Sequence, residues 1–152
     1  MKKLEVIEVL VISAMPLSEL RGGIPLALYL GFSPLESYIL GVVGNLIPVP
    51  FILLLLDKIK NIKIKIISKT YLEITKRIEK KRDLIERYGY VGLMLFVAVP
   101  LPVTGAWTGS LLAFLLGLNK FKSFLAISVG VSLAGIIVTL TSVGVLHIVS
   151  TF

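Results

Sequence analysis

The chain has 152 residues, a formal net charge of +7 and no cysteine, and 56% of its residues are hydrophobic. Soluble domains are usually about 45–50% apolar, and disulfide scaffolds and thiolate metal sites need cysteine, so the composition argues against all three. The apolar residues lie in long blocks, and the mean hydropathy is +0.95. We therefore expect an all-α polytopic protein of the cell membrane, folded as a single membrane domain over residues 1–152.

The first predicted repeat, residues 4–56, begins with two short apolar segments that flank a break. The segments are Val6–Met15 and Ile24–Gly31, and the break contains Pro16 and the stretch SELRGGIP, Ser18–Pro25. Each segment is about half as long as the roughly 30 Å of hydrocarbon that a membrane helix must cross. Because neither segment spans alone, we expect a re-entrant helical hairpin whose break is buried near the middle of the membrane.

A long apolar block completes the first repeat. This block, Leu35–Leu56, holds one charge, Glu36, and is long enough to cross the membrane as a helix. It also contains Asn45, for which two interpretations remain open. The side chain either forms a hydrogen bond to another helix or lines a cavity.

A basic linker, residues 57–88, follows the block. Between Asp57 and Arg87 it has eleven basic and five acidic side chains, hence a net charge of +6. The positive-inside rule places such a linker in the cytoplasm. Helical spacing of apolar residues predicts an amphipathic helix on the membrane surface, through Ile67, Tyr71, Ile74, Ile78 and Ile85.

Two other interpretations apply to the basic linker. Nucleic-acid binding is the first alternative for a basic stretch, but both ends of this one are tethered to membrane-embedded sequence, so we expect no nucleic-acid partner. The linker can also be a solvated connector that fixes the topology and does nothing else.

The second predicted repeat, residues 89–149, has the same order of segments as the first. Gly89–Val99 and Ser110–Leu118 flank the break PLPVTGAWTG, Pro100–Gly109, and the block Ser123–Ser150 carries no charge. A shift of 86 residues aligns the repeats without a gap and pairs Pro16 with Pro102, Leu26 with Leu112, Gly31 with Gly117, Ser37 with Ser123, and Gly44 with Gly130.

The linker determines how the two repeats are oriented. Repeat one ends at the cytoplasmic linker and repeat two begins there, so the two repeats are predicted to be inverted, with both chain termini outside. Inverted repeats with broken helices that meet near the membrane midplane are a recurring transporter architecture.

Glu19 and Arg21 are the charged residues of the first break, and each costs about 2.5–3.5 kcal/mol at membrane depth. One interpretation is a structural ion pair at the hairpin tip. The other is a binding site, in which Arg21 and free backbone N–H groups at Gly22 and Gly23 receive an anion. In that site Glu19 would bind and release a proton.

The other candidate site residues come from both breaks. Hydroxyl groups supply hydrogen bonds to either ligand from Ser18, Thr104 and Thr108. In the repeat alignment, Gly105 and Trp107 correspond to Glu19 and Arg21. No cluster of acidic residues and histidine predicts a metal site, and no motif predicts an enzyme or a cofactor.

The stretches ELRGGIPLAL and AVPLPVTGAWTGSLLAFLLGL together resemble the small multidrug export family, a branch related to the DedA/VTT membrane superfamily. The resemblance covers nearly the whole chain and implies two re-entrant hairpins that face each other. It also implies that acidic and arginine residues of the hairpins serve proton-coupled transport, which carries over to Glu19 and Arg21 only. The second hairpin departs from the wider superfamily, because an arginine typical there is missing and Trp107 lies in that stretch.

We therefore expect a membrane transporter, an ion-coupled carrier or flippase for an amphiphilic anion such as a lipid-linked phosphate. Carriers of undecaprenyl phosphate and lipid scramblases belong to the wider superfamily that the chain resembles. The alternatives are a small multidrug exporter and a non-transporting membrane scaffold. The expected partners are membrane lipids and a second copy of the chain, which would pack on small residues of the last span, Gly130, Ala134 and Gly135.

Overall fold

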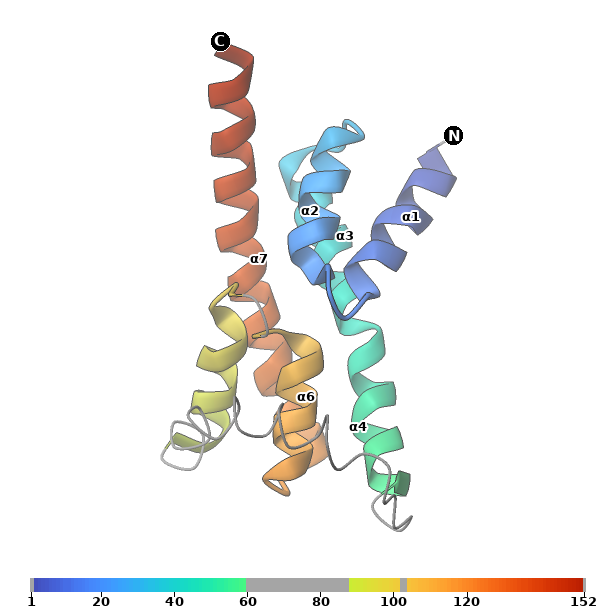
Figure 1. Ribbon diagram of the computed structural model, residues 1–152, viewed down its shortest axis with the longest axis vertical. Coiled ribbons are helices and arrows are strands. Elements are labelled where there is room, and N and C mark those ends of the chain that lie inside the picture. Colours follow the sequence, from blue (N-terminus) through green and yellow to red (C-terminus); the bar gives the residue numbers. More distant parts are fainter. Residues whose placement is uncertain (1, 60–87, 102–103, 152) are drawn as a thin grey trace.

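The computed structural model of the chain describes residues 2–59, 88–101 and 104–151 (Figure 1). Within these ranges the chain is helical and contains no strand. Most of the basic linker lies outside the described residues, so its predicted amphipathic helix stays a prediction.

Two helices in the first half form a hairpin. Helix α1, Lys2–Ala14, and helix α2, Glu19–Tyr29, are joined by a turn at residues 15–18, and they pack against each other. The open end of this hairpin lies at the end of the molecule where both chain termini lie (Figure 1). Its turn points toward the middle of the molecule.

The break in this hairpin is shorter than the sequence predicts. Gly22 and Gly23 lie inside α2, and the Gly22 N–H donates to the Ser18 carbonyl at 3.0 Å, so the expected free N–H group at Gly22 is wrong. Glycine in a helix interior costs about 1 kcal/mol relative to alanine, but the packing of α2 against α1 outweighs this cost. A side chain at Gly23 would overlap Ser13 of α1, so glycine allows the two helices to approach closely.

Two consecutive helices form the first long apolar element. Helix α3, Pro34–Leu46, is followed at Ile47 by helix α4, Pro48–Ile59. The stretch Pro34–Leu55 has 22 residues and a mean hydropathy of 2.2, which is long and apolar enough to cross a membrane. Pro48 has no N–H group to donate to the preceding turn, which explains why the helix is interrupted at this point.

The second half repeats this order from the opposite end of the molecule. Helix Tyr88–Ala98 and helix α6, Ala106–Leu115, form a hairpin that opens away from the chain termini (Figure 1). Helix α7, Lys120–Thr151, then runs back toward the end where the N-terminus lies. Its stretch Lys120–Val145 also has a mean hydropathy of 2.2 and is long enough to cross a membrane.

The same local structure recurs 86 residues apart. Gly31 follows α2 and Gly117 follows α6, both with positive φ, at 86° and 64°. In each case the glycine N–H and the next N–H bond back to the helix, from Phe32 to Ala27 at 3.0 Å and from Leu118 to Ala113 at 2.9 Å. Both α2 and α6 thus end in a Schellman motif, which the left-handed conformation of glycine permits.

The helices that follow these motifs also begin alike. The Ser33 hydroxyl accepts from the Glu36 N–H at the start of α3, and the Ser33 N–H donates in return to the Glu36 carboxylate. The side-chain oxygen Oδ1 of Asn119 accepts from the N–H groups of Phe121 and Lys122 at the start of α7. Side-chain caps therefore fix where both long helices start.

Small residues hold the helices of each half together. In the first half, a Cβ at Gly44 of α3 would meet Ser13 of α1 at 2.7 Å. In the second half, a Cβ at Gly109 or Gly130 would meet Val97 of helix Tyr88–Ala98 at 2.6 and 2.8 Å. Each hairpin is therefore packed directly against the long helix that follows it.

The small residues expected to bind a second copy are covered within the chain. Gly130 and Ala134 are buried, and Gly135 lies against Val42 and Tyr38 of α3. The prediction that these residues of α7 bind a second copy is thus wrong, because other helices of the same chain cover them. Large apolar side chains remain exposed on several helices, among them Leu4, Phe51 and Leu140.

The packing of Gly23 can be tested by substitution. Gly23→Ala should destabilise the protein by about 1–3 kcal/mol, because the added methyl group overlaps the Ser13 side chain. Gly144→Ala is the matched control, since a Cβ there meets nothing within 4 Å and alanine favours a helix. Thermal unfolding in detergent measures both, and equal stability of the two variants would contradict the close packing of α1 and α2.

Candidate functional site

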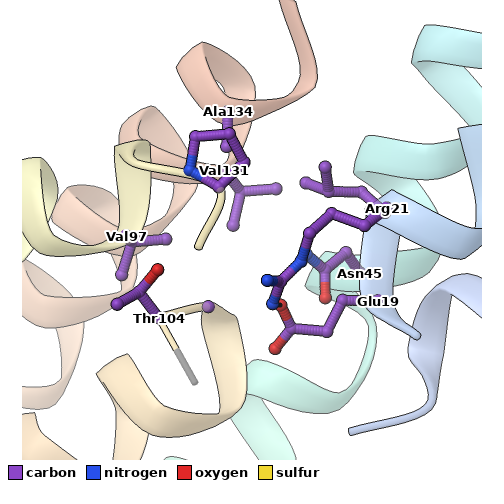
Figure 2. Close-up of a pocket in the computed structure, with 10 residues that line it drawn as sticks. Glu19, Arg21, Asn45, Val97, Thr104, Val131 and Ala134 are labelled. Atoms are coloured by element: carbon purple, nitrogen blue, oxygen red, sulfur yellow. Dashed lines mark hydrogen bonds and ion pairs between the residues drawn. The ribbon is translucent and has the colours of Figure 1, made fainter. Parts of the chain in front are cut away.

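The tips of the two hairpins meet near the middle of the molecule and enclose a small cavity (Figures 1 and 2). The walls come from α2, α3, α7, helix Tyr88–Ala98 and the turn before α6. The lining side chains labelled in Figure 2 are Glu19, Arg21, Asn45, Val97, Thr104, Val131 and Ala134.

Glu19 is the first residue of α2 and is 3% exposed. Its carboxylate oxygen Oε2 pairs with Arg21 Nη2 at 3.1 Å, a contact that one of the two interpretations from the sequence requires (Figure 2). Its backbone has a φ of 48°, in the left-handed region that costs a non-glycine residue about 1–2 kcal/mol. The contacts of its side chain must offset this strain.

The Glu19 carboxylate lies at the N-terminus of α6, in the other hairpin. Gly105 is the N-cap of α6 and offers no side-chain cap, and a Cβ at Gly105 would overlap the Glu19 carboxylate. The carboxylate interacts favourably with the backbone of Trp107, in the first turn of α6. Glu19 therefore caps α6 from a distant part of the chain, where the positive end of the helix dipole favours a negative charge.

Trp107 makes a second link between the hairpins. Its indole Nε1 donates to the carbonyl of Ala14, the last residue of α1, at 3.0 Å. The two tips thus exchange polar contacts in both directions, with Glu19 reaching α6 and Trp107 reaching α1. Sequence reasoning placed Trp107 in the site but did not foresee this bond.

The predicted hydroxyl groups already have backbone partners. Ser18 donates to the Ile12 carbonyl at 2.6 Å, and the Thr104 hydroxyl bonds the carbonyls of Val99 and Leu101 and accepts from the Leu101 N–H. Both hydroxyls therefore shape the hairpin turns, although Thr104 also lines the cavity. Thr108 is half-buried in the first turn of α6 and does not line it.

The structure therefore divides the predicted site residues into two groups. Glu19, Arg21, Thr104 and Gly105 line one cavity, and Trp107 bonds across it. Ser18, Gly22, Gly23 and Thr108 lie nearby but outside the lining. Within the described ranges, no three acidic, histidine or cysteine residues could share a metal ion.

Asn45 of α3 joins the site. It is 1% exposed, it lines the cavity, and its Oδ1 has no hydrogen-bond partner among the described residues. Two interpretations of Asn45 came from the sequence. Its place in the cavity lining is confirmed, and in the described parts of the chain no interhelical hydrogen bond reaches Oδ1. An amide side chain in an apolar span indicated that Asn45 has a role, but the sequence does not say which face of α3 is buried.

The cavity has a volume of about 10 Å³ for the centre of a water molecule, which is about the space that one water needs. No lipid headgroup or drug fits in this space. The two hairpin tips therefore lie close together in this structure, with little space between them.

The contact between Glu19 and Gly105 gives a double-mutant test. Gly105→Ala should destabilise the protein by about 1–3 kcal/mol, because its methyl group would displace the buried carboxylate. In a Glu19→Ala background the carboxylate is absent, so the methyl group of Gly105→Ala has space and should destabilise the protein much less. Unfolding free energies of the four proteins check this, and an equal loss in both backgrounds would rule out the contact.

Comparison with known proteins identifies a family for this chain. The profile described as "Putative small multi-drug export protein" matches residues 19–137, from the start of α2 into α7. Neither the curated proteins nor the solved structures give a significant match. Because the matched stretch covers well over half of the sequence and includes both Glu19 and Trp107, the chain belongs to the small multidrug export family.

Proposed function

We propose that this protein is an ion-coupled carrier in the cell membrane that moves an amphiphilic anion, such as a lipid-linked phosphate. Membership of an export family and two long apolar helices support a membrane protein. The observation that carries the proposal is the buried Glu19 carboxylate, held between the Arg21 guanidinium and the N-terminus of α6. These two groups are the kinds of donors that bind anionic ligands.

The proposed architecture is a pair of inverted repeats with re-entrant hairpins, in a chain that crosses the membrane more than once. Three observations support it. The hairpin helices have 10–13 residues, too few to span about 30 Å of hydrocarbon. The hairpins open toward opposite ends (Figure 1), and caps recur 86 residues apart.

In the proposed mechanism, Glu19 and the substrate anion compete for the same donors. While Glu19 is ionised, its carboxylate occupies Arg21 and the first turn of α6. A proton that binds to Glu19 removes the negative charge, and both donors then become available to the anionic group of the substrate. Proton and anion would therefore cross together, and each would promote binding of the other.

The hairpin tips must separate to admit the substrate, because the closed cavity holds about one water. The polar contacts that join the tips are Glu19 to the backbone of Trp107 and the Trp107 indole to Ala14. Protonation of Glu19 weakens the first of these contacts. The same event would thus free the anion donors and loosen the closed state.

Export of a cationic drug is a second candidate function, favoured by the family description. In that case Glu19 would bind the cation, and Trp107 would lie beside it. A third possibility is a membrane scaffold in which the Glu19–Arg21 pair is only structural. We also propose a homodimer or higher homo-oligomer, which must use surfaces other than the buried small residues of α7.

Transport by purified protein in liposomes tests the carrier. Glu19→Gln preserves the shape of the side chain and removes its ionisable charge, so it should abolish dependence on a proton gradient. Arg21→Lys preserves the charge but loses the planar fork that matches phosphate, so anion affinity should fall about tenfold or more. Polyprenyl phosphates, phospholipids and cationic drugs are compared as substrates.

Glu8→Gln is the matched control, because Glu8 lies exposed on α1 and carries the same change of charge. It should transport like the wild type. If Glu19→Gln and Arg21→Lys also transport normally, or if both fail to fold, the pair is structural and the scaffold replaces the carrier. Transport of cationic drugs alone would favour the exporter.

Labelling of single cysteines tests the inverted architecture. Leu35 and Phe121 lie 86 residues apart, near the starts of α3 and α7, and are 68% and 71% exposed. Leu35→Cys and Phe121→Cys add the only cysteine to a chain that has none. A membrane-impermeant thiol reagent should reach them from opposite sides of the membrane, and labelling from the same side would contradict inverted repeats.

A further inference from the structure

The amide of Asn45 is a buried polar group without a role in the contacts described above. It lies on α3, is 1% exposed, and its Oδ1 has no hydrogen-bond partner among the described residues. Figure 2 shows this amide beside the side chains of Glu19 and Arg21. A buried carbonyl oxygen loses its bonds to water on folding, and native structures rarely leave that loss uncompensated.

The cavity offers a matching partner by its size and its polar groups. Its volume of about 10 Å³ for a water centre corresponds to one water molecule. A buried water typically makes about three hydrogen bonds. Here Asn45 Oδ1 and the Glu19 carboxylate can each accept one, and the Arg21 guanidinium can donate one.

A metal cation of the same size fits the charges less well. Arg21 lies in the same cavity and already pairs with the Glu19 carboxylate, so the lining is electrically neutral. The other lining groups are Asn45, Thr104 and apolar side chains. Water suits this mixture of donors and acceptors, whereas a cation would face the guanidinium charge.

The second repeat shows that an apolar side chain is compatible with this position. Val131 of α7 lies 86 residues after Asn45, lines the same cavity and is fully buried (Figure 2). The packing of the long helices therefore does not require an amide at this place. The amide adds a hydrogen-bond acceptor on the side of the cavity where Glu19 lies.

We propose that this cavity is a binding site for one water molecule, held between Asn45 Oδ1 and the Glu19 carboxylate, and that this water delivers the coupling proton to Glu19. As the water accepts one proton, it passes another to a carboxylate oxygen of Glu19, and it remains a neutral water on Asn45. The reverse transfer releases the proton. The water site stands by itself, and the delivery of the proton rests on the proposed carrier function.

Asn45→Val is the variant that tests the site, because it copies the residue of the second repeat. Infrared spectra of the protein in lipid bilayers, recorded in ordinary water and in H₂¹⁸O, identify an internal water by the isotope shift of its O–H band. This band should be present in the wild type and lost in Asn45→Val. The matched control is Ser37→Ala, which removes another buried oxygen of α3, outside the cavity, that has no partner in the described parts of the chain.

Persistence of the band in Asn45→Val would overturn the water site. So would a rise in melting temperature with Na⁺ but not K⁺ that disappears in Asn45→Val, because it would indicate a bound cation. Asn45→Val should keep the wild-type melting temperature within a few degrees, and a variant that does not fold is replaced by Asn45→Leu in the same spectra.

Transport separates the second half of the proposal from the first. Asn45→Val should lower proton-coupled transport on the order of 10²-fold, and Ser37→Ala should transport like the wild type. Loss of the water band with normal transport would show that the water is structural and not a proton donor. If the wild type transports nothing, the carrier function fails, and the spectra still decide whether the water is bound.

Discussion

The buried carboxylate of Glu19 is the constraint on which the centre of the molecule depends. A charge removed from water requires compensation by an opposite charge and by hydrogen bonds. Arg21 supplies the charge from the same helix, and the first turn of α6 supplies a backbone donor from the other hairpin. Gly105 leaves the space that the carboxylate fills, and the left-handed backbone of Glu19 directs it there. The two halves of the chain are therefore joined by an electrostatic contact that one proton can weaken.

The contact between Glu19 and Gly105 joins positions that correspond in the 86-residue alignment of the two halves. It forms because the residues at these two positions differ. Glu19 and Gly105 are 86 residues apart, and a carboxylate at both positions would place two like charges in one closed space. Arg21 and Trp107 are separated by the same interval, with one neutralising the carboxylate and the other bonding Ala14 across the interface. The recurring caps around Gly31 and Gly117 preserve the common helix framework, while the residues at the tips have taken separate roles.

Length and charge predicted most of the helical framework, because they depend on dimensions that the bilayer sets. The half-length segments and the long apolar blocks follow from such reasoning, and the structure contains both. The Glu19–Arg21 contact was one of two interpretations from the sequence, and the two side chains do pair. The reasoning was wrong at Gly22 and Gly23, because glycine both breaks helices and allows close packing, and the neighbouring side chains, Ser18 at Gly22 and Ser13 at Gly23, cannot be read from the sequence. The role of Gly105 was equally inaccessible, since it depends on a side chain 86 residues away.

The distribution of contacts indicates where the molecule can open. Within each half, glycines bring backbone and side chains into close contact, as at Gly44 with Ser13 and at Gly130 with Val97, and such packing resists shear because small shifts cause overlap. Between the halves, α2 and α3 contact α7, and α4 contacts α6, through the apolar core cluster. Gly135 of α7 packs closely on Val42 and Tyr38 of α3, and the Tyr38 hydroxyl donates to the Ser132 carbonyl, in addition to the polar contacts at the hairpin tips. Separation of the two halves therefore has to break the packing of Gly135 and the Tyr38–Ser132 hydrogen bond as well as the contacts of Glu19.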